Sequence, residues 1–179
     1  MKNIFEKGLL LFFVLLANFA VGDELENSIK YGVLLTEAVQ DKKVVKLKKL
    51  NQYKEIKNYL SDNKCPGFKY KAYIVGPEEN RKFYLVASKG KNVIIGRHFK
   101  AEISGDIIDL STFESSTNGC LNLGPVKSNA AGMYATHLKP FPNEFHLLQS
   151  NIRGIALYIG TKEGMYVVND GEMVLSKDE

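Results

Sequence analysis

Histidines and carboxylates are the first residues of this chain whose types and spacing could do chemistry. The chain has only three histidines, at positions 98, 137 and 146. Glu144 and His146 are two residues apart, as on one face of a strand, and His137 could approach them across a turn. Two imidazoles and a carboxylate are ligands that zinc accepts. His137, Glu144 and His146 are therefore weak candidates for a metal site, because nothing in their spacing requires a metal.

Motifs that signal catalysis are missing from the sequence. It contains no Gly-x-Ser-x-Gly turn, no phosphate-binding glycine loop, no His-Glu-x-x-His pair and no dinucleotide fingerprint. Carboxylate pairs such as Asp106 and Asp109 match glycosidase chemistry in number only. The sequence therefore favours a protein without catalysis or cofactor, and it leaves a small hydrolase as an alternative.

Lysines provide a stronger signal, because the charge is unevenly distributed. Residues 42–100 contain sixteen lysines and arginines and four carboxylates, a net charge of +12, although the whole chain carries only +4. Residues 23–41 and 101–179 carry −4 and −5. A field of one sign steers association with an oppositely charged partner. The predicted partner-binding residues are Lys42, Lys43, Lys46, Lys48, Lys49, Lys89 and Lys91.

Two other interpretations of the basic segment remain open. Lysines commonly solvate helix faces and protect edge strands from aggregation. They could also contact phosphates of lipopolysaccharide or another anionic envelope glycan. Nucleic acid is not expected as a partner, because arginine suits phosphate recognition better and lysine dominates here.

The N-terminus has the pattern of a secretory signal peptide. Lys2 and Lys7 precede an apolar run from Leu9 to Ala17, and small residues at Ala20 and Gly22 fit a cleavage site. The stretch is shorter than the roughly 20 residues that a membrane-spanning helix needs. We therefore predict a signal peptide at residues 1–22, a single mature domain at residues 23–179 and a periplasmic location, with secretion from the cell as an alternative.

The expected export bears on the oxidation state of the two cysteines. Cys65 and Cys120 are the only cysteines of the chain. In an oxidising compartment an isolated pair favours one disulfide bond over two free thiols. The sequence therefore predicts a bond between them.

The hydrophobic pattern predicts an α+β domain, mainly an antiparallel sheet with one amphipathic helix. The helix is expected from Leu50 to about Asn63, where apolar residues recur at three- and four-residue spacing. Residues 29–38 suit a strand or a helix. A short helix is expected at residues 129–138. Strands are expected at residues 68–75, 82–87, 92–95, 98–103, 107–113, 144–149, 155–159, 165–168 and 173–175, with a type I′ turn at Asp170-Gly171.

Together these features suggest a bacterial periplasmic protein that acts by binding another protein. An inhibitor or immunity protein that neutralises an envelope-targeting toxin is the most concrete version. A binder of anionic envelope components and a small hydrolase are the alternatives. The sequence identifies neither the partner nor the oligomeric state.

Overall fold

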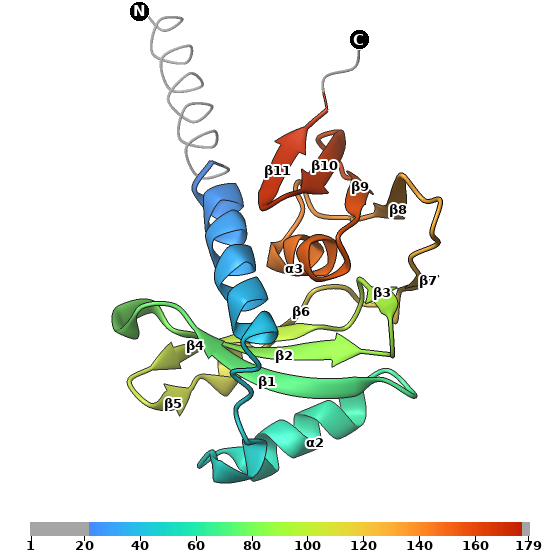
Figure 1. Ribbon diagram of the computed structural model, residues 1–179. Helices are drawn as coiled ribbons and strands as arrows, with labels where there is room; N and C mark the ends of the chain where they lie inside the picture. The colour runs from blue at the N-terminus through green and yellow to red at the C-terminus, as the bar shows by residue number, and fades with distance from the viewer. Residues whose placement is uncertain (1–21, 177–179) are drawn as a thin grey trace, which may run out of the picture.

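The computed structural model describes residues 22–176 (Figure 1). The predicted signal peptide, apart from Gly22, lies outside the described residues. Among those that are described, no helix combines the length and the apolar character needed to cross a membrane. The fold contains an N-terminal helix, two main sheets and two further α-helices, and the helices pack against the sheets.

The N-terminal helix covers residues 22–40 and settles the choice left open for residues 29–38. Tyr31, Leu35 and Ala38 lie on one buried face because they are four and three residues apart. Gly32 lies on this helix against Leu147, and a Cβ atom at Gly32 would be 2.8 Å from the Leu147 Cδ2 atom. The glycine therefore allows a close approach between two helices.

A five-stranded antiparallel sheet forms the lower half of Figure 1. Its central strand β2 (Lys82–Ser88) is buried on both faces: Phe83 and Leu85 pack toward α2 (Tyr53–Asn63), whereas Tyr84 and Val86 pack toward the N-terminal helix. The other strands are β1 (Lys69–Val75), β4 (Phe99–Ser104), β5 (Ile107–Ile108) and β6 (Glu114–Ser115), in the order β1-β2-β4-β5 with β6 also paired to β4.

A four-stranded sheet forms the C-terminal half, in the order β11-β10-β9-β8. Only β8 and β9 are parallel, and α3 (Glu144–Arg153) connects them. The strands are β8 (Gly132–Thr136), β9 (Ala156–Gly160), β10 (Met165–Asn169) and β11 (Glu172–Leu175). Between the two halves, β3 (Asn92–Ile94) pairs with β7 (Asn122–Pro125). Short 3-10 turns occur at η1 (Leu47–Lys49), η2 (Glu78–Asn80) and η3 (Leu110–Thr112).

The predicted fold class is confirmed: the chain is an α+β domain with mostly antiparallel sheet. The predicted helix is α2, and the described residues contain two more. The Cys65–Cys120 disulfide is present and joins the end of α2 to the loop before β7. Asp170 and Gly171 both have positive φ, as the predicted hairpin turn requires.

Three predicted elements are wrong. Residues 144–149 form α3 instead of a strand, because Asn143 caps the helix and Gly154 ends it in the left-handed conformation. Residues 132–136 form a strand instead of a helix, since pairing with β9 overrides the helix preference of alanine. The strand expected at residues 107–113 stops at Ile108 and continues as η3.

Candidate functional site

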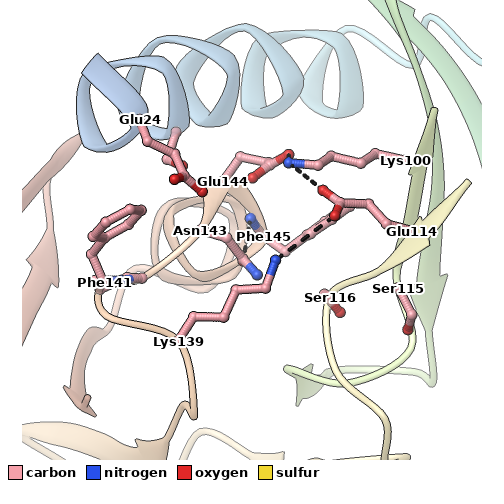
Figure 2. A pocket seen from close by; sticks show the side chains of 12 residues that line it. Glu24, Lys100, Glu114, Ser115, Ser116, Lys139, Phe141, Asn143, Glu144 and Phe145 are labelled. Atoms are coloured by element: carbon pink, nitrogen blue, oxygen red, sulfur yellow. Dashed lines mark hydrogen bonds and ion pairs between the residues drawn. The ribbon is translucent and has the colours of Figure 1, made fainter. Parts of the chain in front are cut away.

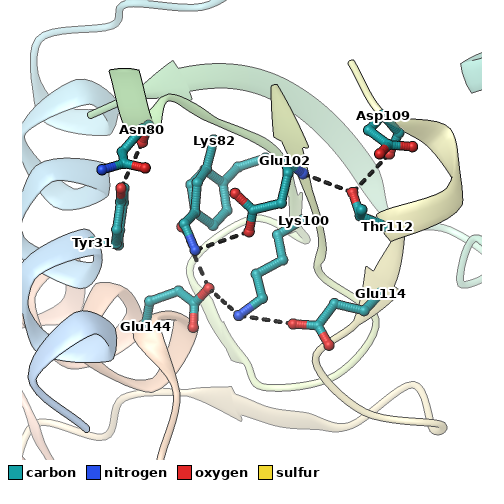
Figure 3. A network of polar contacts seen from close by, with 10 residues as sticks. Tyr31, Asn80, Lys82, Lys100, Glu102, Asp109, Thr112, Glu114 and Glu144 are labelled. Carbon is teal, nitrogen blue, oxygen red and sulfur yellow. Dashed lines mark hydrogen bonds and ion pairs between the residues drawn. The ribbon is translucent and has the colours of Figure 1, made fainter. Parts of the chain in front are cut away.

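A buried charged cluster lies between β4, β6 and the start of α3. The Lys100 ammonium is 3.0 Å from Glu144 Oε1 and 2.8 Å from Glu114 Oε1 (Figure 3). The Glu144 side chain is only 3% exposed. The Tyr84 hydroxyl donates a hydrogen bond to the same Glu144 oxygen over 3.4 Å. Residues of β2 and β4 therefore contact the Glu144 carboxylate at the start of α3, and β6 joins the cluster through the pair of Glu114 with Lys100.

The electrostatics of this cluster fix its protonation state. Burial opposes a charge on Lys100, but Glu144 and Glu114 outweigh it and raise the pKa of Lys100 well above its ordinary value. Burial likewise opposes the Glu114 carboxylate, and its hydrogen bond with Lys100 still holds the Glu114 pKa below the usual value. Burial, with the nearby Glu144, raises the pKa of Tyr84. The two carboxylates thus favour the charged form of Lys100.

The cavity beside this cluster is small (Figure 2). Its volume of about 20 Å³ has room for about one water molecule. Lys139 lies across it from the ion pair, 3.8 Å from Glu114 Oε2. A substrate does not fit this space. We interpret the cluster as a structural ion-pair network that connects the five-stranded sheet to α3. The lining residues are Glu24, Ser28, Lys100, Glu114, Ser115, Ser116, Lys139, Phe141, Pro142, Asn143, Glu144 and Phe145.

The histidines are buried and their pKa values are lowered. The Nδ1 atom of His98 accepts a hydrogen bond from the Ala87 amide, and its Nε2 atom contacts the Ile94 carbonyl. Burial lowers the pKa of His98 to about 4. The rings of His137 and His146 meet edge to face, with centroids 4.8 Å apart. Burial is the main cause that lowers the pKa of His137 to about 4, and the charge of Lys139 adds to it. Burial is also the main cause that lowers the pKa of His146 to about 3, with His137 adding to it.

The candidate metal ligands do not share the geometry that the sequence suggested. His146 lies on a helix, where its Nδ1 accepts a hydrogen bond from the Asn143 amide, and Glu144 is paired with Lys100. The Nε2 atoms of His137 and His146 are buried without a hydrogen-bond partner in the described part of the chain. Within residues 22–176, no three His, Cys, Asp or Glu side chains form a group that could hold a metal ion.

A basic groove runs along the outer side of β1, and it is the second candidate site. Its walls are the segment 44–49 and the strand residues Tyr70–Ala72, with Tyr53 of α2 beside them. The lysines at its rim are Lys46, Lys48, Lys49 and Lys71, all exposed. Its apolar lining consists of Val44, Val45, Leu47, Tyr53, Tyr70 and Ala72.

The backbone of the basic groove is fixed by hydrogen bonds. The Val45 amide donates to the Ala72 carbonyl over 2.8 Å, which ties the segment 44–49 to the edge of the sheet. The η1 turn then closes through a bond from the Lys49 amide to the Lys46 carbonyl. A site held in place before binding loses less conformational entropy when a ligand arrives.

The structure brings some of the predicted binding lysines together. Lys46, Lys48 and Lys49 line the groove, and none of them forms an ion pair among residues 22–176. Lys42 and Lys43 lie in the preceding turn, where Lys43 pairs with Asp41 at 2.9 Å.

The remaining predicted lysines lie elsewhere. Lys89 and Lys91 flank Gly90 between β2 and β3 and do not line the groove. Sequence reasoning missed the contribution of Tyr53 and Tyr70. The alternation of Tyr70 with Lys69 and Lys71 was visible, but which segment would face that strand was not.

Comparison of the chain with protein-family models, curated proteins and solved structures finds no match.

Proposed function

We propose that this protein acts by binding another protein, which presents an acidic segment to the basic groove. One observation carries the proposal: four exposed lysines without ion-pair partners among the described residues surround an apolar, preformed groove. The most concrete version is a periplasmic inhibitor or immunity protein that neutralises an envelope-targeting toxin. Export through the signal peptide at residues 1–22 belongs to the same proposal.

The two kinds of side chain in the groove contribute differently to binding. The lysines attract an acidic partner over a distance and raise the association rate. The valines and tyrosines exclude water and give the contact its affinity, because exposed ion pairs alone contribute little. This combination favours an acidic protein segment with apolar side chains over a purely anionic polymer.

The test reverses the charge of the groove. In the variant Lys46→Glu/Lys48→Glu/Lys49→Glu, association with a partner captured from envelope extract should slow by about tenfold or more at low salt. Its rate should also depend less on salt than that of the unmodified protein. Stopped-flow or surface plasmon resonance measures both quantities.

A matched control changes the net charge equally without touching the groove. Lys30, Lys127 and Lys162 are exposed and lie outside it, so Lys30→Glu/Lys127→Glu/Lys162→Glu should keep most of the association rate. Equal rates for the unmodified protein and the groove variant would refute the proposal. Loss of co-sedimentation with anionic vesicles in the groove variant, without any protein captured by the unmodified chain, would instead support an envelope-surface binder.

A further inference from the structure

Strand β8 is an edge strand whose outer side has no neighbour in the described structure. It pairs with β9 in parallel on one side only. The His137 amide donates to the Gly160 carbonyl, and in a strand every second residue directs its backbone to the same side. The backbone groups of Gly132, Tyr134 and Thr136 therefore point away from β9. Among residues 22–176 no other backbone segment bonds to them.

The edge of β8 lacks the usual protection against pairing with another chain. No residue from 128 to 138 is a lysine, arginine, aspartate or glutamate. Natural edge strands are normally guarded by charges, prolines, bulges or a covering segment. The edge strand β1 follows that rule, because it carries Lys69 and Lys71 and is crossed at Ala72 by Val45. On the far edge of the C-terminal sheet, β11 carries Glu172.

The outer face of the same sheet carries exposed aromatic side chains. Tyr134 and Tyr158 are register partners on β8 and β9, and they are 56% and 39% exposed. A Cβ atom at Gly132 would lie 2.4 Å from the Tyr158 ring, and one at Gly160 would lie 2.8 Å from the Tyr134 hydroxyl. Each ring therefore lies over a glycine of the neighbouring strand. Leu138, just beyond the strand, is 82% exposed.

We propose that β8 is a dimerisation edge, at which a second copy of this chain pairs its own β8 in antiparallel orientation. The two C-terminal sheets would then form one continuous sheet across a two-fold axis. An uncharged strand suits a copy of itself, because two-fold antiparallel pairing about Tyr134 sets Gly132 opposite Thr136 of the copy and opposes no like charges. Pairing through β1 would instead set lysines against lysines. The inference is independent of the basic groove, which lies on the other sheet.

The experiment measures the molar mass of the full chain by light scattering across the micromolar range. Thr136 is exposed and its amide points outward, so Thr136→Pro removes an edge donor without breaking the ladder to β9. Thr136→Lys puts on this edge the charge with which natural edge strands prevent pairing. The unmodified protein should be a dimer, and both variants should be monomers.

A matched control introduces the same charge on the opposite edge strand. Val174 of β11 is 55% exposed, and Val174→Lys should remain a dimer. Circular dichroism checks that each variant is folded; if Thr136→Pro is not, Thr136→Lys decides alone. A monomeric unmodified protein at every concentration would overturn the inference. A dimer that survives Thr136→Lys would overturn it equally, as would capture of a different protein by a monomeric chain through β8.

Discussion

At the scale of single residues, Lys100 stands out because its ammonium pairs with two carboxylates. It neutralises Glu144, which is almost wholly buried, and it also bonds Glu114. A buried carboxylate without its counter-ion is very costly, even where the intact pair adds little net stability. Removing Lys100 should therefore destabilise the fold mainly because Glu144 would remain buried and unpaired.

Replacing Lys100 with methionine should lower the free energy of unfolding by about 3–5 kcal/mol, because Glu144 would remain buried without a counter-ion. Urea unfolding followed by circular dichroism measures the change. The control is Lys139→Met: the Lys139 side chain is 49% exposed and lies 3.8 Å from Glu114, so its loss should cost about 0–1 kcal/mol. Similar losses for the two variants would contradict our interpretation of the cluster.

This cluster could not be predicted from the sequence. Lys100 is one of sixteen basic residues in its segment, and Glu144 is separated from it by more than forty positions. Nothing local marks the pair, because the contact is created by the docking of α3 onto the five-stranded sheet. The basic run at residues 42–49 was visible for the opposite reason: its lysines are neighbours in sequence.

At the scale of elements, two of the wrong predictions fall on elements that are buried or exposed nearly throughout. Residues 144–150 are all buried, so α3 has no exposed face in that stretch, and its alternation of polar and apolar residues at 144–147 also suits a strand. β8 has the reverse problem, since only Ala135 is buried, and the alanines at positions 130, 131 and 135 favour a helix. Elements with one buried and one exposed face, such as α2, were predicted correctly.

The disulfide fastens two of these elements, and its loss should be measurable. Cys65 and Cys120 are 55 residues apart, and closing such a loop stabilises a fold by about 4 kcal/mol at most on the chain-entropy estimate. We expect Cys65→Ser/Cys120→Ser to lower the free energy of unfolding by about 2–4 kcal/mol in urea. A reducing agent should destabilise the unmodified protein similarly and leave the double variant unchanged. If the reductant affected neither, the bond would have no structural role.

At the scale of the whole molecule, the N-terminal helix unites the two halves. Tyr31 and Leu35 belong to the core shared with β1, β2 and α3, whereas Ile29 and Val33 pack against the core of the C-terminal sheet. The N-terminal helix thus contributes side chains to the cores of both sheets. The fold class could be predicted from local patterns, but this arrangement of two sheets around one helix could not.

The three buried histidines make global stability depend on pH. Their folded pKa values lie near 4, 4 and 3, below the ordinary 6.5, so protons bind to the unfolded chain first as the pH falls. Their contribution to the free energy of unfolding is complete above about pH 6.5. It declines toward about pH 4 for His98 and His137 and toward about pH 3 for His146, by at most about 1.4 kcal/mol per pH unit for each histidine.

Urea unfolding at a series of pH values from neutral to mildly acidic checks this expectation. His137→Gln should remove the share of one histidine from the slope, whatever it does to stability at neutral pH. A slope unchanged by this substitution would mean that His137 titrates alike in the folded and unfolded chain.

The two ends of the described chain emerge on the same side of the molecule. In Figure 1 the start of the N-terminal helix and the end of β11 lie in the upper part, whereas α2 and the segment 44–49 lie at the bottom. A dye, bead or sensor surface coupled at either end of residues 22–176 would thus sit remote from the lysines of the basic groove. An immobilised molecule would face the solution with its cationic end, ready for capture experiments without redesign.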